Sequence, residues 1–124
     1  MQDKPTPDQL LQAVAQFLRE RVMPQLDTQT AFHTRVSANV LDIIARQWQI
    51  APPAEVQELS RLQALLDSQG TLEELNDQLC ERIASGELTT STPGLVEHLW
   101  QITLDKLAVD QPRYETYRRI TQQP

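Results

Sequence analysis

The feature that most constrains this chain is the placement of its prolines and glycines. They fall almost only between segments whose apolar residues recur every three or four positions. That spacing gathers apolar side chains on one face of an α-helix, whereas a half-buried strand requires alternation. No segment alternates for more than a few residues, and Leu88-Thr89-Thr90 is too short for a strand. The pattern therefore predicts an all-α fold, a single-domain bundle of five to six short-looped helices over residues 1–124.

Capping residues mark where these helices begin. Thr6 is followed by Pro7 and by Gln9 three positions on, and Thr71 is followed by Glu74 at the same spacing. A threonine N-cap with an acid or amide three residues later is a capping box. Gly86 is suited to end the helix that starts after Thr71. Thr92-Pro93 repeats the threonine-proline start and predicts another helix there.

The longest predicted helix runs from Asp27-Thr28 to about Ile50, and its apolar face predicts a central position. Ala51-Pro52-Pro53 is expected to end it, because proline disfavours helical geometry in the residue before it. Ala54 then opens the next helix, which runs to Gly70. The apolar face comprises Phe32, Val36, Val40, Ile43, Ile44 and Trp48, and a similar stripe in the first helix comprises Leu10, Leu11, Val14, Phe17 and Leu18.

The charge balance narrows the classes of partner. Seventeen acidic residues against 11 basic residues give a formal net charge of −6. A negative field repels phosphate backbones and anionic lipid, so we expect neither nucleic-acid nor membrane binding. No apolar run reaches the ~20 residues that span a bilayer. The single cysteine, Cys80, forms no internal disulfide, which favours a reducing, cytoplasmic location.

The residues of common catalytic and metal sites are sparse. The two histidines, His33 and His98, have no second histidine one helical turn away. His98 lies beside Glu97, and Asp105 follows seven residues on, but this face is equally consistent with a solvated one. We therefore expect no metal and no cofactor. Cys80 lies beside Leu79 and Ile83, which predicts an inert thiol packed in the core. Whether the protein is an enzyme stays open, and the absence of a nucleophile with a partner argues against it.

The first group of candidate binding residues is His33, Arg35 and Asn39 in the long helix. Arg35 and Asn39 continue into a polar stripe with Asp42 and Arg46, for which surface ion pairs of Asp42 with Arg46 or Arg35 are the simple interpretation. Asn39 lies between apolar positions, which predicts partial burial. It would then either hold a neighbouring loop or line a pocket.

The second group lies near the C-terminus, where basic and aromatic residues gather in an otherwise acidic chain. Arginine pairs bidentately with carboxylate or phosphate, and tyrosine adds rigid contact area. The cluster would bind an anion or a partner protein; alternatively, its tyrosines pack on the bundle and its arginines pair with acidic surface residues. Asp110 is expected to accept backbone N–H groups at the turn. The candidate residues are Asp110, Arg113, Tyr114, Tyr117 and Arg118, with Arg119 beside them.

Three blocks of the chain carry a resemblance over nearly its full length. They are Pro5-Thr6-Pro7-Asp8-Gln9-Leu10-Leu11 with Val14, Phe17 and Leu18; Ala31-Phe32-His33 with Arg35, Val36 and Asn39; and Leu107 with Val109, Asp110 and Pro112-Arg113-Tyr114. Together they resemble a family of small uncharacterised bacterial proteins, a domain of unknown function. That family is commonly encoded beside aminoglycoside-phosphotransferase-like kinases and acyl-CoA dehydrogenases. The resemblance implies a metabolic neighbourhood and supplies no catalytic residue.

Three hypotheses of function follow. The first is a non-catalytic accessory or protein-interaction module for a kinase-like phosphotransferase in acyl-CoA-related metabolism. The second is a binding protein for a small ligand, an acyl-CoA or a phosphorylated metabolite, held in an apolar slot with arginines on its phosphates. The third is an enzyme that uses His33 with Asp110 or Tyr114 as an acid/base pair. A homodimer would follow if one amphipathic helix exposed an apolar face.

Overall fold

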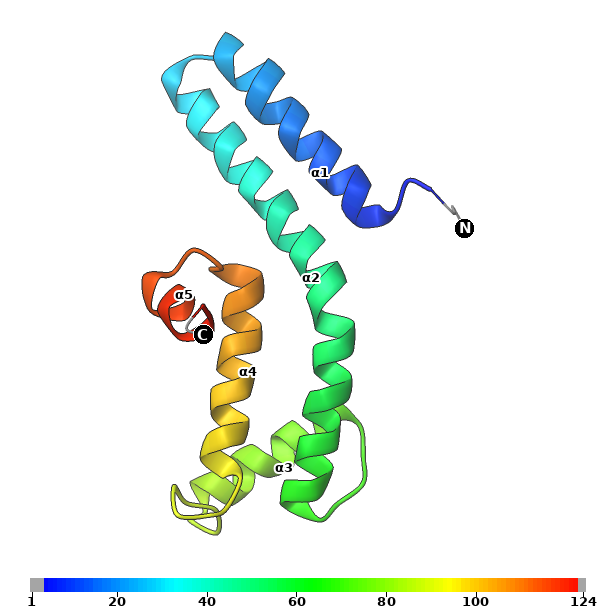
Figure 1. The fold of residues 1–124 in the computed structure, drawn as a ribbon, viewed down its shortest axis with the longest axis vertical. Helices are drawn as coiled ribbons and strands as arrows, with labels where there is room; N and C mark the ends of the chain where they lie inside the picture. Colours follow the sequence, from blue (N-terminus) through cyan, green and yellow to red (C-terminus); the bar gives the residue numbers. More distant parts are fainter. Residues whose placement is uncertain (1–3, 123–124) are drawn as a thin grey trace. The chain divides into compact units, whose positions relative to one another are not determined.

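A computed structural model describes residues 4–122 and contains five α-helices within that range (Figure 1). They are α1 (Pro7–Phe17), α2 (Thr28–Leu66), α3 (Leu72–Ala84), α4 (Leu95–Asp110) and α5 (Glu115–Thr121). No strand occurs between residues 4 and 122, so the predicted all-α class is confirmed. The chain divides after Ala51 into two compact units, here the N-terminal unit and the C-terminal unit. The single-domain assignment stays a prediction.

The N-terminal unit is a helical hairpin. The capping box predicted before α1 is present, and the N–H of Thr6 donates to Oε1 of Gln9 at 2.9 Å. Beyond Phe17 the helix continues through a π-helical turn, Leu18–Val22, and a 3₁₀ turn, Met23–Gln25, which contains Pro24. Proline cannot continue the ladder of helical hydrogen bonds, so the chain turns there.

Asp27 starts α2 by accepting the first free N–H groups of the helix. Its Oδ1 accepts from the N–H groups of Gln29 and Thr30, both at 3.1 Å, and its Oδ2 accepts from the Thr30 hydroxyl at 2.7 Å. Hydrogen bonds from Thr30 hold the pKa of Asp27 below its ordinary value. The predicted start of this helix is confirmed.

The predicted end of this helix is wrong, because α2 runs through Pro52 and Pro53 to Leu66 as one helix of 39 residues. The two prolines remove the N–H groups that would bond the carbonyls of Trp48 and Gln49, and their rings crowd the same carbonyls. All four residues are exposed, so water can solvate those carbonyls. The helical hydrogen bonds and apolar spacing on both sides of the prolines then outweigh the loss of these two hydrogen bonds.

Small side chains form the buried interior of the N-terminal unit. Among its described residues only Ala15, Ala38 and Ala45 are buried. The large apolar side chains that were expected to form a central core stripe are instead substantially exposed: Leu10, Val14, Phe17, Phe32, Val36, Val40, Ile44 and Trp48. A pair of helices has room inside for one narrow row of residues, and alanines occupy that row here.

Capping also sets the helices of the C-terminal unit. The N–H of Thr71 donates to Oε2 of Glu74 at 2.8 Å and the N–H of Glu74 donates to the Thr71 hydroxyl at 3.2 Å, which confirms the second capping box. The predicted start at Thr92-Pro93 is wrong. The Thr92 hydroxyl accepts from the N–H of Thr89 instead, and Gly94 is the N-cap at a φ of 84°, which glycine adopts without steric strain.

Leucines form the core of the C-terminal unit. In Figure 1, α4 runs back along the second half of α2, and α3 crosses at one end of this pair. Cys80 of α3 is exposed, so the expectation that it packs in the core is wrong. Residues from α2, α3, α4 and the loop before α4 supply the buried cluster: Leu62, Leu66, Leu75, Leu79, Leu88 and Leu95.

No helix of residues 4–122 combines the length and the hydropathy needed to cross a bilayer.

A polar pocket in the C-terminal unit

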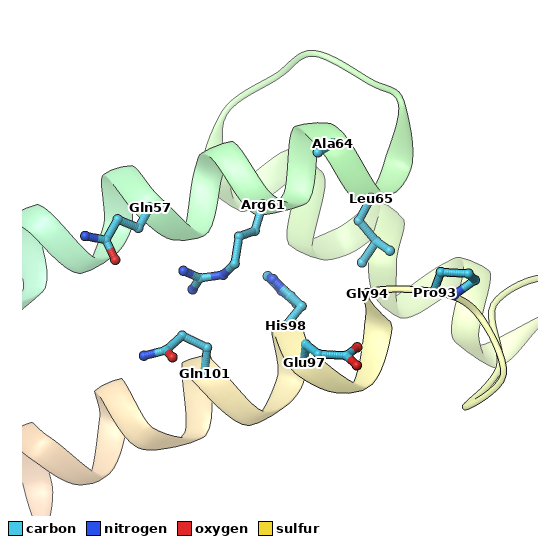
Figure 2. Close-up of a pocket in the computed structure, with 9 residues that line it drawn as sticks. All are labelled: Gln57, Arg61, Ala64, Leu65, Pro93, Gly94, Glu97, His98 and Gln101. Carbon is cyan, nitrogen blue, oxygen red and sulfur yellow. The ribbon is translucent and has the colours of Figure 1, made fainter. Parts of the chain in front are cut away.

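A pocket of ≈ 550 Å³ lies between the second half of α2 and the first half of α4, entirely within the C-terminal unit (Figure 2). Its floor is apolar near Leu65 and Pro93, and polar side chains occupy the rest. In Figure 2 the side chains of Arg61 and His98 reach from opposite helices into the space between them. The lining residues are Gln57, Arg61, Ala64, Leu65, Pro93, Gly94, Glu97, His98 and Gln101.

His98 is the most unusual residue of the pocket. It is 2% exposed, so the interpretation of its helix face as a solvated one is wrong. Neither Nδ1 nor Nε2 has a hydrogen-bond partner among the described residues. The great majority of buried polar atoms in proteins are hydrogen-bonded, so two unpartnered ring nitrogens are exceptional.

Arg61 faces His98 from α2 and is also incompletely paired. Its Nη2 lies 3.8 Å from Oδ2 of Asp105, an ion pair that is longer than a hydrogen bond. The buried Nε and Nη2 of Arg61 have no hydrogen-bond partner among residues 4–122. Gln101 holds the other oxygen of Asp105, since its Nε2 donates to Oδ1 at 2.9 Å. The carboxylate is thereby fixed while the guanidinium keeps unused donors.

The electrostatics of the pocket keep His98 neutral. Burial lowers the pKa of His98 from its ordinary value, and the positive charge of Arg61 lowers it further. Glu58 raises that pKa, but less strongly. Glu58 is itself engaged by Asn76 of α3, whose Nδ2 donates to Oε1 at 3.0 Å. A neutral imidazole carries one N–H donor and one acceptor nitrogen.

These donors match the shape of a small anion. Nε and Nη2 of an arginine form a planar fork that fits two oxygens of a carboxylate or phosphate. A neutral His98 can add one N–H to the same group. The N-terminus of α4 begins at Gly94 beside the pocket, and the positive end of a helix dipole favours an anion there. The carboxylate of Glu97, which also lines the pocket, repels a ligand that carries more than one negative charge.

Arg61 and His98 were not among the binding residues predicted from sequence. The signal that could have revealed His98 is its spacing. The inner face of α4 carries the buried residues Leu95 and Val109. His98 follows Leu95 by three positions and Asp105 precedes Val109 by four, so both polar residues lie on that face. The sequence around Arg61, which precedes the buried Leu62, contains no comparable signal that its side chain lies in a pocket.

The first predicted group, His33, Arg35 and Asn39, lies on the part of α2 in the N-terminal unit. The His33 ring meets the Phe32 ring edge-on at 5.5 Å between centroids, and the Arg35 guanidinium lies 5.6 Å from the centroid of Phe32. Asn39 is exposed, so its predicted partial burial is wrong. Its Oδ1 accepts from Nη2 of Arg19 at 2.8 Å, a contact between helical segments of one hairpin.

Two members of the second predicted group, Arg113 and Arg118, line another cavity, of ≈ 650 Å³, at the C-terminal end of the described chain, whereas Asp110, Tyr114 and Tyr117 do not line it. It is lined by Arg113, Glu115, Arg118, Arg119 and Gln122. Tyr114 is exposed and Tyr117 is half-buried. Asp110 ends α4, and the N–H of Tyr114 donates to the Gln111 carbonyl instead of to the Asp110 carboxylate. This places three arginines around one cavity, and binding at these residues stays a prediction.

Between residues 4 and 122 no three histidine, cysteine, aspartate or glutamate side chains are arranged to hold a metal ion.

The fold and this pocket define a small helical protein, and its sequence assigns it to a family. The family model described as a domain of unknown function, DUF6285, matches residues 24–114, and the chain belongs to that family. The matched range includes both Arg61 and His98. No curated protein and no solved structure matched the chain.

Proposed function

We propose that this protein binds a small anionic ligand in the pocket between α2 and α4, with a carboxylate or phosphate group on Arg61 and His98. The observation that carries the proposal is the set of four buried nitrogens without partners, Nε and Nη2 of Arg61 and both ring nitrogens of His98. A buried donor that finds no acceptor costs about 1–3 kcal/mol, and an anion would remove that cost. The pocket thus supports the small-ligand hypothesis over the acid/base hypothesis centred on His33.

Glu97 and the apolar floor restrict the ligand further. A carboxylate at the pocket repels a second negative charge, so a singly charged group fits better than a dianion. Leu65, Ala64 and Pro93 offer contact to an apolar portion of the same ligand. An organic acid with a short apolar body satisfies both conditions. A phosphorylated metabolite or an acyl-CoA remains within the proposed class through its phosphate groups, because the thioester of an acyl-CoA is uncharged.

The test measures the binding of three probes, butyrate, inorganic phosphate and butyryl-CoA, to the full chain. Thermal unfolding reports the added stability and calorimetry reports the affinity. At a ligand concentration of 100 times the dissociation constant, we expect about 2.7 kcal/mol of added stability. Arg61→Met should abolish the effect. Arg118→Met, which removes an arginine from the other cavity, is the matched control and should leave it unchanged. No shift with any probe, or an equal shift in Arg61→Met, would exclude this site.

We also propose, as a second function, an accessory role beside a kinase-like phosphotransferase in acyl-CoA-related metabolism of a bacterium. The supporting observation is the arrangement of Arg113, Arg118 and Arg119 around one exposed cavity, which suits an acidic surface on a partner. Co-purification with the kinase-like protein tests it, and the triple replacement of these arginines by glutamine should abolish association. A cytoplasmic location belongs to the same proposal. No association at tens of micromolar would rule out this role.

A further inference from the structure

The four buried nitrogens of the pocket differ in what they require from a ligand. Nε and Nη2 of Arg61 are always donors, because the guanidinium stays protonated. A neutral imidazole has one N–H and one bare nitrogen, whichever tautomer is present. The atoms of Arg61 and His98 that lack a partner among residues 4–122 are therefore three donors and one acceptor. A carboxylate only accepts hydrogen bonds, so it satisfies the donors and leaves the acceptor nitrogen of His98 without a partner.

Two changes could satisfy that remaining nitrogen. His98 is 2% exposed, and in Figure 2 its side chain reaches into the space between α2 and α4 toward Arg61. A buried acceptor that finds no donor is unfavourable. Either the ligand brings a donor group of its own, or the bare nitrogen takes up a proton and becomes a second N–H donor.

The charges around the pocket favour the proton. From α2, Arg61 is the one cation and Glu58 acts on His98 with its negative charge. From α4, Glu97 lines the pocket and Asp105 lies 3.8 Å from Arg61. One positive against three negative charges gives a formal charge of −2 while His98 is neutral. A bound monoanion makes this −3, whereas an anion that enters with a proton leaves it at −2. A hydroxyl or amide on the ligand would supply a donor but no positive charge.

A carboxylate on Arg61 also removes what keeps His98 neutral. The charge of Arg61 is, after burial, the second cause of the low pKa of His98. A bound carboxylate offsets that charge. A negative charge within about 4–6 Å of an imidazole also stabilises the protonated ring directly. Both effects raise the pKa of His98 when the anion binds.

We infer that His98 takes up one proton when the pocket binds a carboxylate, so that the site takes in an organic acid as its anion and a proton together. The inference rests on the proposed function, because it concerns the same pocket. With the proton in place, all four buried nitrogens are donors and the formal charge around the pocket is unchanged. Binding then strengthens as the pH falls, by up to about tenfold per pH unit while only the bound form is protonated.

Calorimetry of the full chain with butyrate counts the protons. Butyrate stays ionised between pH 6 and pH 8, since carboxylic acids ordinarily have pKa values of about 4. The heat of binding varies with the ionisation enthalpy of the buffer in proportion to the number of protons exchanged. Titrations over this range, in two buffers of different ionisation enthalpy, should show an uptake that approaches one proton at its maximum. The affinity should fall over the same range as the pH rises.

His98→Gln removes the titrating group and keeps an amide that can donate and accept. This variant should bind butyrate without taking up a proton, and its affinity should not change with pH. His33→Gln is the matched control, because His33 is exposed and lies in the N-terminal unit. It should keep the full proton uptake.

Proton NMR of the wild-type chain keeps the inference falsifiable if His98→Gln fails to fold. Each histidine gives a Cε1–H resonance whose position reports its protonation, and His33→Gln assigns the two signals. Butyrate should move the resonance of His98 toward the imidazolium position and leave that of His33 in place.

The outcomes separate this inference from the proposed function. Butyrate binding without proton uptake, or binding of phosphate but not of butyrate, would overturn the inference and leave the proposed function standing. Proton uptake that persists in His98→Gln would assign the proton to another group and also overturn it. A chain that binds none of butyrate, phosphate and butyryl-CoA would overturn both.

Discussion

Arg19 holds Asp42 through two hydrogen bonds, with Nη2 2.6 Å from Oδ2 and Nη1 3.3 Å from Oδ1. The same Nη2 also donates to Oδ1 of Asn39. A further link joins the opposite end of the hairpin, where Nε2 of Gln49 donates to Oδ2 of Asp8 at 2.7 Å. These polar contacts fix the register of two helices whose buried side chains are alanines.

A double-mutant cycle on Arg19 and Asp42 should detect their coupling. Both side chains are about one third exposed, so solvent screens the ion pair and the expected coupling energy is roughly 0.5–1 kcal/mol. Arg19→Met, Asp42→Asn and the double variant are compared by urea unfolding. Arg19→Lys keeps the charge but not the fork, and should lose part of the coupling. Strictly additive effects would contradict the pairing.

The stability of the protein should fall as the pH drops below about 6.5, the ordinary pKa of histidine. Burial and Arg61 lower the pKa of His98 in the folded protein. Below pH 6.5, His98 is therefore protonated in the unfolded chain but stays neutral in the folded one, which favours unfolding. Stability then declines from pH 6.5 toward the folded pKa. The carboxylates of Asp8, Asp27 and Glu74, whose pKa values hydrogen bonds lower, weaken the fold only at more acidic pH.

His98→Leu isolates this effect. The variant should flatten the slope of unfolding free energy between pH 5 and pH 7, as measured by urea unfolding at each pH. Gln101→Leu alters the same pocket without removing a titrating group and should keep the slope. An unchanged slope in His98→Leu would contradict a buried, neutral histidine.

Leu62→Ala should destabilise the protein by about 2–5 kcal/mol, because Leu62 is fully buried at the centre of the leucine cluster and its loss leaves a cavity. Val56→Ala, on the same helix and largely exposed, should change stability by less than about 0.5 kcal/mol. Thermal and chemical unfolding of the full chain measure both. Similar effects at the two positions would contradict the assigned core.

Replacing Pro52 and Pro53 together by alanine should raise the stability of α2. Each alanine is up to about 3 kcal/mol more favourable than proline inside a helix and restores one backbone hydrogen bond. Pro93→Ala, in the loop before α4, is the control and should be neutral or slightly destabilising. Unfolding midpoints and helical circular dichroism measure the change. A loss of stability on replacing the pair would show that the chain does not continue as a helix through them.

Local chemistry predicted the helix starts at Thr6, Asp27 and Thr71, whereas the starts predicted at Ala54 and Thr92 were wrong. Long-range burial could not be predicted from the sequence. The capping boxes at Thr6 and Thr71 involve residues three apart, so they can be read directly. Asn39 and His98 were both misjudged, in opposite senses. Whether a helical face meets solvent depends on which other helix lies against it, and apolar spacing alone does not carry that information.

The same limit explains the candidate site. Arg61 and His98 are 37 positions apart, and only the antiparallel course of α2 and α4 brings them to one pocket. The helix through Pro52 and Pro53 was missed for a different reason. A proline pair is a strong local signal for an ending, and the exposed side of α2 tolerates the two unbonded carbonyls.

The alanine interior of the N-terminal unit determines how mutagenesis will report on this protein. Alanine scanning leaves a residue that is already alanine unchanged, so it would detect the polar pairs between the two arms of the hairpin and pass over the buried Ala15, Ala38 and Ala45. Substitutions that add atoms to these alanines probe the interior directly. Ala38, which is fully buried, is the position where a single added isopropyl group would force the two helices apart.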